Sequence, residues 1–401
     1  MIKRRFSLNI YQLIIVLFIV SIWAFNEEKY ITYPLKIIYI AVLLFYCFKK
    51  NRLNTVFQFW TLLMIALSLF ACLIARFEPN SLYTLVNMLQ VFIIGFVTFG
   101  YLDHLKKINF FIVAILIGGL VLTARLLITT PLSAFLSFER LGESIGYNAN
   151  DVGNKAMISA LACIFIMRRL KSKKRAFLFL SFLPLFAVVL FSGSRKDLLG
   201  LFLGLFVVYT IGLKNKKNLF VSLIVIFALL IFVYYLIMNN DSLYMTIGRR
   251  IESLINSFSG GSEAGSIDIR KVYMTTAWGF VVDSYFVGIG LGQFAVLSGY
   301  GVYCHCDYLE VMCSYGLLGF VAYYAPYIIY FLKLMVKKPK TAVDYSMISL
   351  EVVLLFMCVT MVMYISAYSI ILLCLIASSS TISEKSIKFC PSGNELLSIS
   401  I

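Results

Sequence analysis

The chain has 401 residues, of which 61% are hydrophobic and 13% are charged; its mean hydropathy is +0.92 and its formal net charge is +16. A soluble domain has about 45–50% apolar and about 25% charged residues, so the composition excludes an ordinary water-soluble protein. The apolar runs are about 20 residues long, which indicates membrane helices and not the roughly ten-residue alternating strands of a membrane barrel.

The apolar runs predict the membrane spans. In chain order they are 7–25, 31–48, 54–75, 81–102, 108–128, 152–167, 176–191, 198–213, 218–238, 307–332 and 345–378. The last run is long enough for two short spans with Ser366 to Tyr368 between them, so we predict eleven or twelve helices in one all-α membrane domain, 1–401. No small-residue cleavage site follows the first run, which indicates an anchor and not a removed signal peptide.

Basic clusters fall in every second loop between the predicted spans. They are KRR at 3–5, KKNR at 49–52, LKK at 105–107, RRLKSKKR at 168–175, KNKK at 214–217 and KLMVKKPK at 333–340, and they hold 21 of the 35 Lys and Arg residues. Positive loops mark the cytoplasmic side, so we expect a cytoplasmic amino terminus. Because the charge is divided among short loops, we assign it to topology and to anionic lipid, and not to nucleic acid.

The other side of the membrane receives 129–151, the short loop 192–197 and the long segment 239–306. Loops longer than about 12–15 residues are usually functional or disordered. Within the long segment GGSEAGS is a flexible stretch, whereas its flanks have helical apolar spacing. We therefore predict a small helical layer outside the membrane, formed by a large extracytoplasmic loop at 239–306.

The stretch ESIGYNANDVGNKAM crowds amides at the outer start of a span. Asn150 or Asp151 can cap the helix. The other interpretation is that amides beyond the cap, such as those of Asn148 and Asn150, bind sugar hydroxyls.

The outer turn FSGSRKDLLG contains Arg195 and Lys196, against the topological trend. An arginine at the bilayer centre costs about 2.5–3.5 kcal/mol, so this pair belongs at the water edge or in a polar cavity. One interpretation is an interfacial arginine that contacts lipid phosphate. The other is an anion site, in which the planar fork of Arg195 matches phosphate oxygens and Asp197 favours the helix dipole or holds Arg195.

The external segment SIDIRKVYMTTAWGFVVDSYFVGIGLGQF opens a helix with Arg270 and Lys271. Taken alone, its run GIGLGQF resembles a dinucleotide loop, but that fingerprint requires a strand before it and a parallel sheet around it. We expect these glycines to allow a tight turn back to the membrane.

The stretch YCHCDYLEVMCSYGLLGF places His305 at the start of a span, followed by Asp307 and Glu310 one helical turn apart. An interfacial histidine is one interpretation. Zinc is another, because Cys304 and Cys306 flank the ring, but the second ligand pair of a zinc site is missing. We therefore predict no metal here.

These motifs, in this order and on one side, resemble the O-antigen ligase and O-antigen polymerase superfamily over about residues 140–325. The resemblance implies a GT-C-like membrane glycosyltransferase that moves a glycan from undecaprenyl pyrophosphate to an acceptor outside the cytoplasmic membrane. It implies functional roles for Arg195, Arg270 and His305. Family members often have asparagine after the histidine, where this chain has Cys306, which puts a role for that neighbour in doubt.

The chemistry of these residue types fits that activity. Arginines can neutralise the charge that grows on a leaving pyrophosphate, and a histidine with a pKa near 6.5 can take a proton from an acceptor hydroxyl. No D-x-D triad occurs, so neither a metal nor another cofactor is predicted. The remaining predicted substrate-binding residues are Lys196, Lys271, Asn148, Asn150, Asp307 and Glu310.

Three functions remain open from the sequence. We favour a polymerase that builds a capsule, O-antigen or exopolysaccharide, because nothing marks a dedicated acceptor domain; a ligase is the second. The third is a lipid-linked oligosaccharide flippase, which would carry many mid-span charges, whereas Lys36, Arg125 and Glu351 are the obvious ones here. The predicted partners are a lipid-linked glycan donor, a glycan acceptor, the bilayer, a chain-length regulator and a flippase.

Overall fold

The computed structural model describes residues 9–131, 140–143, 146–170, 172–211, 216–249, 251–252 and 266–382. Across these ranges the chain is built of helices and contains no strand. This confirms the all-α fold class predicted from the apolar runs.

The long helices coincide with the predicted spans. They are α1 (Ile10–Ala24), α2 (Lys29–Lys49), α3 (Val56–Leu73), α4 (Glu78–Tyr101), α5 (Leu105–Thr129), α7 (Ala149–Met167), α8 (Ser172–Phe191), α9 (Arg195–Thr210), α10 (Lys216–Asn239), α15 (Asp307–Val336), α16 (Ala342–Cys358) and α17 (Ala367–Thr381). Between α10 and α15 lie α13 (Ser266–Asp283) and the short elements α11 (Asp241–Leu243), η2 (Tyr244–Gly248) and α14 (Phe294–Leu297).

Six helices in the described ranges are long and apolar enough to cross a membrane, namely α2, α3, α4, α5, α8 and α15. A bent pair, Leu223–Asn239 with Asp241–Gly248 at 96°, makes a seventh if it counts as one span. The chain is therefore a multi-pass membrane protein, with fewer full-length spans by this measure than the eleven or twelve predicted. The difference arises because α1, α9, α16 and α17 are shorter than 18 residues and α7 begins with polar side chains.

The last apolar run divides into α16 and α17, as the sequence allowed, but the break covers 359–366 and so begins earlier than expected. Asp307, at the start of α15, accepts hydrogen bonds from the backbone N–H groups of Met363 and Tyr364, at 2.6 and 2.8 Å. These bonds replace the helical partners that the break removes, which explains why a carboxylate is buried here.

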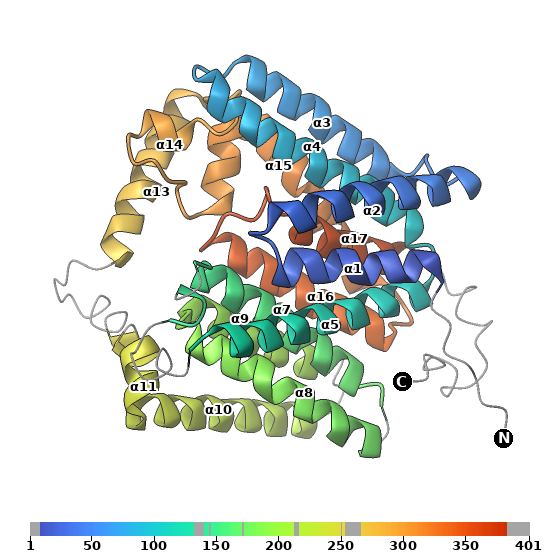
Figure 1. Ribbon diagram of the computed structural model, residues 1–401, viewed down its shortest axis with the longest axis vertical. Coiled ribbons are helices and arrows are strands. Elements are labelled where there is room, and N and C mark those ends of the chain that lie inside the picture. The colour runs from blue at the N-terminus through green and yellow to red at the C-terminus, as the bar shows by residue number, and fades with distance from the viewer. Residues whose placement is uncertain are drawn as a thin grey trace.

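The helices form one bundle with α17 near its middle (Figure 1). The closest packing joins α1 to α5, α5 and α8 to α7, α3 to α4, α9 to α16, and α4 to α17. Small side chains allow these approaches: a Cβ added at Gly119 would lie 2.2 Å from Ser159 Cβ on α7. At the left edge of Figure 1, α13 and α14 pack beside α15, and α11 turns away from the end of α10.

The loop GIGLGQF fastens α13 and α14 to the bundle. Ile289 N–H donates to the carbonyl of Cys313 on α15, at 2.7 Å, and Leu291 N–H donates to the carbonyl of Ala71 on α3, at 3.0 Å. All three glycines have positive φ. Gly316, opposite them on α15, has φ 65°, and a Cβ there would lie 2.3 Å from the Phe286 carbonyl carbon. The glycines thus serve a tight backbone contact.

Candidate functional site

The turn between α8 and α9 places two cations at the start of α9. The turn closes because Gly193 has φ 65°, and an added Cβ would lie 2.8 Å from the carbonyl oxygen of Thr246 in η2. Arg195 and Lys196 are the first two residues of α9 and both are half-buried. The predicted S-G-S-R-K turn therefore exists as a tight corner covered by the segment after α10.

Arg140 holds this turn against the start of α7. Its Nε donates to the carbonyl oxygen of Ser192 and its Nη2 donates to Oδ1 of Asn150, both at 2.8 Å. Its Nη1 lies 3.0 Å from an exposed carboxylate oxygen of Glu143. Asn150, predicted to bind substrate, thus orients Arg140 through its side-chain oxygen.

Asp197 lies directly beneath the turn and is fully buried. Neither of its oxygens has a hydrogen-bond partner among the described residues. Ser194 and Asn154 lie close to the carboxylate but outside hydrogen-bond geometry. Burial raises the pKa of Asp197 to about 6, against the opposing effect of the Lys196 charge.

Charged groups from four segments of the chain act on Lys196. Burial lowers its pKa to about 8, and the charges of Arg270 and Arg140 act in the same direction. The carboxylates of Asp197 and Asp151 oppose that shift. Lys196 therefore shares one electrostatic environment with an arginine from α13 and with the residues that flank the start of α7.

His305 lies in an unusual backbone conformation, with φ 62°, in the loop before α15. Residues other than glycine that adopt positive φ are uncommon, and such strain gathers at functional sites. The half-buried ring stacks on Tyr273, with centroids 5.9 Å apart and planes at 12°, and it meets Tyr303 edge-on at 4.6 Å. Glu310 fixes the loop because its carboxylate accepts a hydrogen bond from Cys304 N–H at 2.8 Å.

The electrostatics of His305 tie it to the same two cations. Burial lowers the pKa of His305 to about 4, and the charges of Arg270 and Lys196 add to that effect. Arg270 and Tyr273 are three residues apart on α13, so they share a helix face. The face of α13 that stacks on the ring therefore also presents Arg270. We call Arg140, Lys196, Arg270 and His305 the cationic centre.

Other predicted site residues have different surroundings. Lys271 and Asn148 are exposed, and the Asn148 side chain caps α7 by accepting from Asn150 N–H at 2.9 Å. Asp307 also accepts from the hydroxyl of Tyr324, at 2.6 Å. Glu310 contacts the loop and not the imidazole. Substrate contacts by these four residues, and the role of Arg195, remain predictions.

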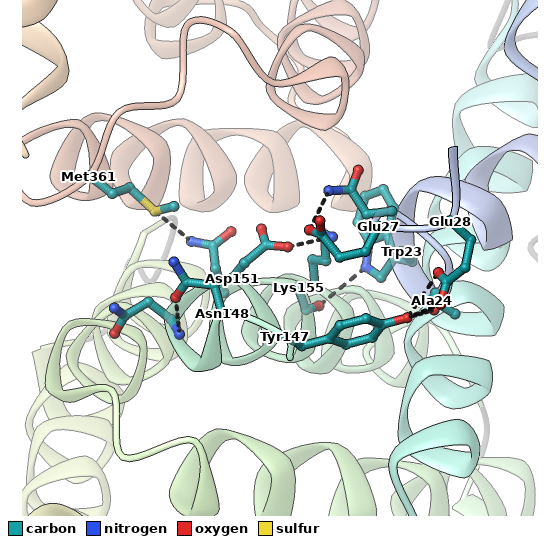
Figure 2. Close-up of polar contacts among 12 residues, drawn as sticks. Trp23, Ala24, Glu27, Glu28, Tyr147, Asn148, Asp151, Lys155 and Met361 are labelled. Atoms are coloured by element: carbon teal, nitrogen blue, oxygen red, sulfur yellow. Dashed lines mark hydrogen bonds and ion pairs between the residues drawn. The ribbon is translucent and has the colours of Figure 1, made fainter. Parts of the chain in front are cut away.

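Asp151 and Lys155 form an ion pair on the first turns of α7, at 2.6 Å. Figure 2 shows both side chains pointing from α7 toward Trp23 and Glu27 at the end of α1. Trp23 Nε1 donates to the carbonyl oxygen of Lys155 and to Ser159 Oγ, at 3.3 and 3.0 Å. Because Asp151 also acts on Lys196, this pair borders the cationic centre.

Sequence reasoning missed Arg140. A weak signal was present, because Arg140 is a basic residue in the outer stretch just before the amide-rich run. The described residues contain no cluster of three or more His, Cys, Asp or Glu side chains arranged to hold a metal ion.

Residues 179–324 match the family model described as O-antigen ligase, Wzy_C. The match confirms the predicted resemblance to the O-antigen ligase and polymerase superfamily, whose members are glycosyltransferase-like ligases and polymerases. Lys196, Arg270 and His305 all lie within the matched residues. No curated protein matches the chain.

Proposed function

We propose that this protein polymerises oligosaccharide repeat units carried on undecaprenyl pyrophosphate, on the outer side of the cytoplasmic membrane. The observation that carries the proposal is the contact of the His305 ring with Tyr273, one turn from Arg270 on α13. The charges of Arg270 and of Lys196, at the start of α9, both act on this ring. Two cations beside a neutral imidazole fit a reaction that expels a pyrophosphate and removes a hydroxyl proton.

In the proposed reaction an acceptor hydroxyl oxygen attacks the anomeric carbon of the donor glycan. The bond from that carbon to the pyrophosphate oxygen breaks, and its electron pair leaves with the lipid pyrophosphate. Arg270 and Lys196 stabilise the negative charge on the leaving pyrophosphate, and Arg195, next to Lys196 in the turn, donates hydrogen bonds to it. A ring nitrogen of His305 takes the hydroxyl proton.

The lowered pKa keeps His305 unprotonated at neutral pH, which a base requires. A group with a pKa of about 4 is a weak base, but the bound pyrophosphate would offset the charges of Arg270 and Lys196. We therefore propose that the donor raises the basicity of His305 at the step where a base is needed. Glu310 contributes by holding the loop through Cys304 N–H.

The test uses a deletion strain and complementing variants. Deletion of the protein should abolish the ladder of glycan lengths and leave single repeat units on undecaprenyl pyrophosphate. Complementation with Arg270→Ala or His305→Ala should fail at normal protein levels, with a rate loss of about 10²–10⁴-fold for His305→Ala in the purified reaction. A normal ladder from both variants would contradict the proposed site.

A ligase is the second candidate, because the matched family model is described as O-antigen ligase. The two activities differ in where the product remains. A polymerase leaves the growing chain on undecaprenyl pyrophosphate, whereas a ligase transfers a finished glycan to a different molecule. Separation of lipid-linked from transferred glycan in the deletion strain distinguishes them: unpolymerised lipid-linked units support the polymerase, and accumulated long lipid-linked chains support the ligase.

A further inference from the structure

A polar pocket of about 280 Å³ adjoins the cationic centre. It lies between the end of α1, the beginnings of α2, α7 and α17, and one face of α4. Five charged side chains line it together with neutral polar groups, namely Glu27, Lys29, Lys36, Asp151 and Lys155.

Asp151 connects this pocket to the centre. It lines the pocket, and its charge also acts on Lys196. Figure 2 shows the Asp151–Lys155 pair between α7 and the end of α1, where the pocket begins. A molecule that occupied the pocket would therefore lie next to a donor held by Lys196 and Arg270.

Three lysines line the pocket, and they differ in their surroundings. Lys29 is exposed at the first residue of α2. Lys155 is buried and paired with Asp151. Lys36 is half-buried about two turns into α2, and its Nζ donates to Oε1 of Gln90 at 2.5 Å. No carboxylate in the described ranges lies within ion-pair distance of Lys36. A charged side chain at membrane depth is costly unless it is paired, so Lys36 is suited to an anionic ligand.

The neutral groups favour a saccharide as the carrier of that anion. Asn87 and Gln90 offer amides to hydroxyl groups, and Tyr33 offers an aromatic face. Tyr368 lines the same pocket, and its buried hydroxyl has no partner within the described part of the chain. Ligand pockets usually measure about 300–1,000 Å³, so this one suits a short piece of glycan.

We infer that this pocket, the acceptor pocket, binds a carboxylate-bearing sugar of the acceptor glycan, with Lys36 as the partner of the carboxylate. Three lysines and two carboxylates leave the lining with one net positive charge, which matches a carboxylate. A phosphate carries more charge and is matched better by the planar fork of an arginine. The inference rests on the proposed function, because it takes the occupant of the pocket to be the molecule that the donor glycan joins.

The experiment measures affinity by calorimetry with the full chain in phosphatidylcholine nanodiscs. The probes are the repeat-unit saccharide released from its carrier by mild acid, the same saccharide with its carboxyl groups reduced to alcohols, and undecaprenyl pyrophosphate. The variants are Lys36→Gln and, as a matched control, Lys49→Gln at the exposed opposite end of α2. We expect the wild type to bind the intact saccharide at least about tenfold more tightly than the reduced one.

Lys36→Gln should abolish that preference, and Lys49→Gln should keep it. The inference is overturned if the saccharide contains no carboxylate, or if Lys36→Gln binds the intact saccharide like the wild type. It is also overturned if the only affinity lost is for phosphatidylglycerol added to the nanodisc, since Lys36 would then serve a lipid headgroup. Undecaprenyl pyrophosphate tests the proposed function separately: Arg270→Ala should weaken its binding, whereas Lys36→Gln should not.

Discussion

The imidazole of His305 is held in place before any substrate arrives. Its backbone has positive φ, its ring lies against Tyr273 and Tyr303, and Glu310 anchors the preceding residue. The conformation costs free energy that packing and hydrogen bonds must supply. A fixed, neutral ring next to Arg270 is better explained by a reaction than by snorkelling to the lipid interface.

The pH dependence follows from the charges around this ring. In the free enzyme Arg270 and Lys196 help to lower the pKa of His305 to about 4, so the acid limb of kcat/KM that belongs to His305 should lie near that value, below the titration of Asp197 at about 6. A bound pyrophosphate offsets both cations, so the acid limb of kcat should lie at a higher pH, nearer the ordinary value of 6.5. Steady-state rates between pH 4 and 8 would measure both profiles.

In this experiment His305→Gln is the control. Glutamine keeps hydrogen-bonding capacity and has no titrating nitrogen, so the acid limb should disappear along with most of the rate. Near-normal activity of that variant would give the ring a positioning role and contradict its role as a base.

Arg140 gives a prediction about the scaffold of the cationic centre. Arg140→Ala removes the hydrogen-bond donor of the Ser192 carbonyl and of the Asn150 side chain, so the free energy of unfolding should fall by about 1–3 kcal/mol. It should also displace Lys196 and so weaken the affinity for the lipid-linked donor glycan. Arg140→Lys should be intermediate, because it keeps the charge without the fork. Thermal unfolding in detergent and donor affinity are the measurements.

Glu143→Gln is the matched control for Arg140. It removes only the ion pair to an exposed carboxylate, and exposed pairs contribute little. Loss of donor affinity in Glu143→Gln equal to that in Arg140→Ala would show that the charge pair, and not the contact to the turn, is what matters.

The candidate site was partly predictable from the sequence. Lys196, Arg270 and His305 could be named because each occurs in a short polar motif on one side of a hydrophobic chain. Arg140 could not, because its role depends on Ser192 and Asn150 approaching each other through the packing of α7. The use of Asp307 to satisfy Met363 and Tyr364 is likewise a long-range fact that local spacing does not encode.

At the scale of helices and loops, the backbone contact between the GIGLGQF loop and α15 leaves no room for an added Cβ. Gly316→Ala would place a Cβ 2.3 Å from the Phe286 carbonyl carbon on a residue with φ 65°, so a loss of about 3 kcal/mol or more is expected. Gly299→Ala has a similar φ of 74° with nothing within 4 Å, and strain alone should cost about 1–2 kcal/mol.

Gly279 completes this series as an exposed helical glycine with open space around its Cα. Gly279→Ala should be neutral or stabilise by up to about 1 kcal/mol. The midpoint of thermal unfolding should therefore be highest for Gly279→Ala, lower for Gly299→Ala and lowest for Gly316→Ala. A Gly316→Ala protein as stable as the Gly299→Ala protein would mean that the loop and α15 separate easily.

Helix positions were predictable because span length is set by the bilayer, but helix ends and breaks were not. The run 345–378 gave no strong stop signal, so the break at 359–366 was placed too late. Its position depends on Asp307, far away in the chain, which accepts from the two N–H groups that the break exposes. Tertiary partners decide such a break, and local composition does not.

For the whole molecule, the decisive prediction is the orientation in the membrane. The alternation of basic loops predicts that the cationic centre lies outside and that the loop at 337–341 lies in the cytoplasm. Tyr300 and Lys338 are both exposed, one near His305 and the other between α15 and α16. A cysteine at either position can therefore report its side of the membrane.

In intact cells a membrane-impermeant maleimide should label Tyr300→Cys, and it should label Lys338→Cys only after the membrane is permeabilised. The parent protein is the control for its own cysteines, most of which are buried in the described ranges. The orientation matters for the proposed mechanism, in which a carrier lipid presents its glycan to an external site while nucleotide-activated sugars remain inside. Labelling of Lys338→Cys but not of Tyr300→Cys in intact cells would place the cationic centre in the cytoplasm and rule out polymerisation at the outer face.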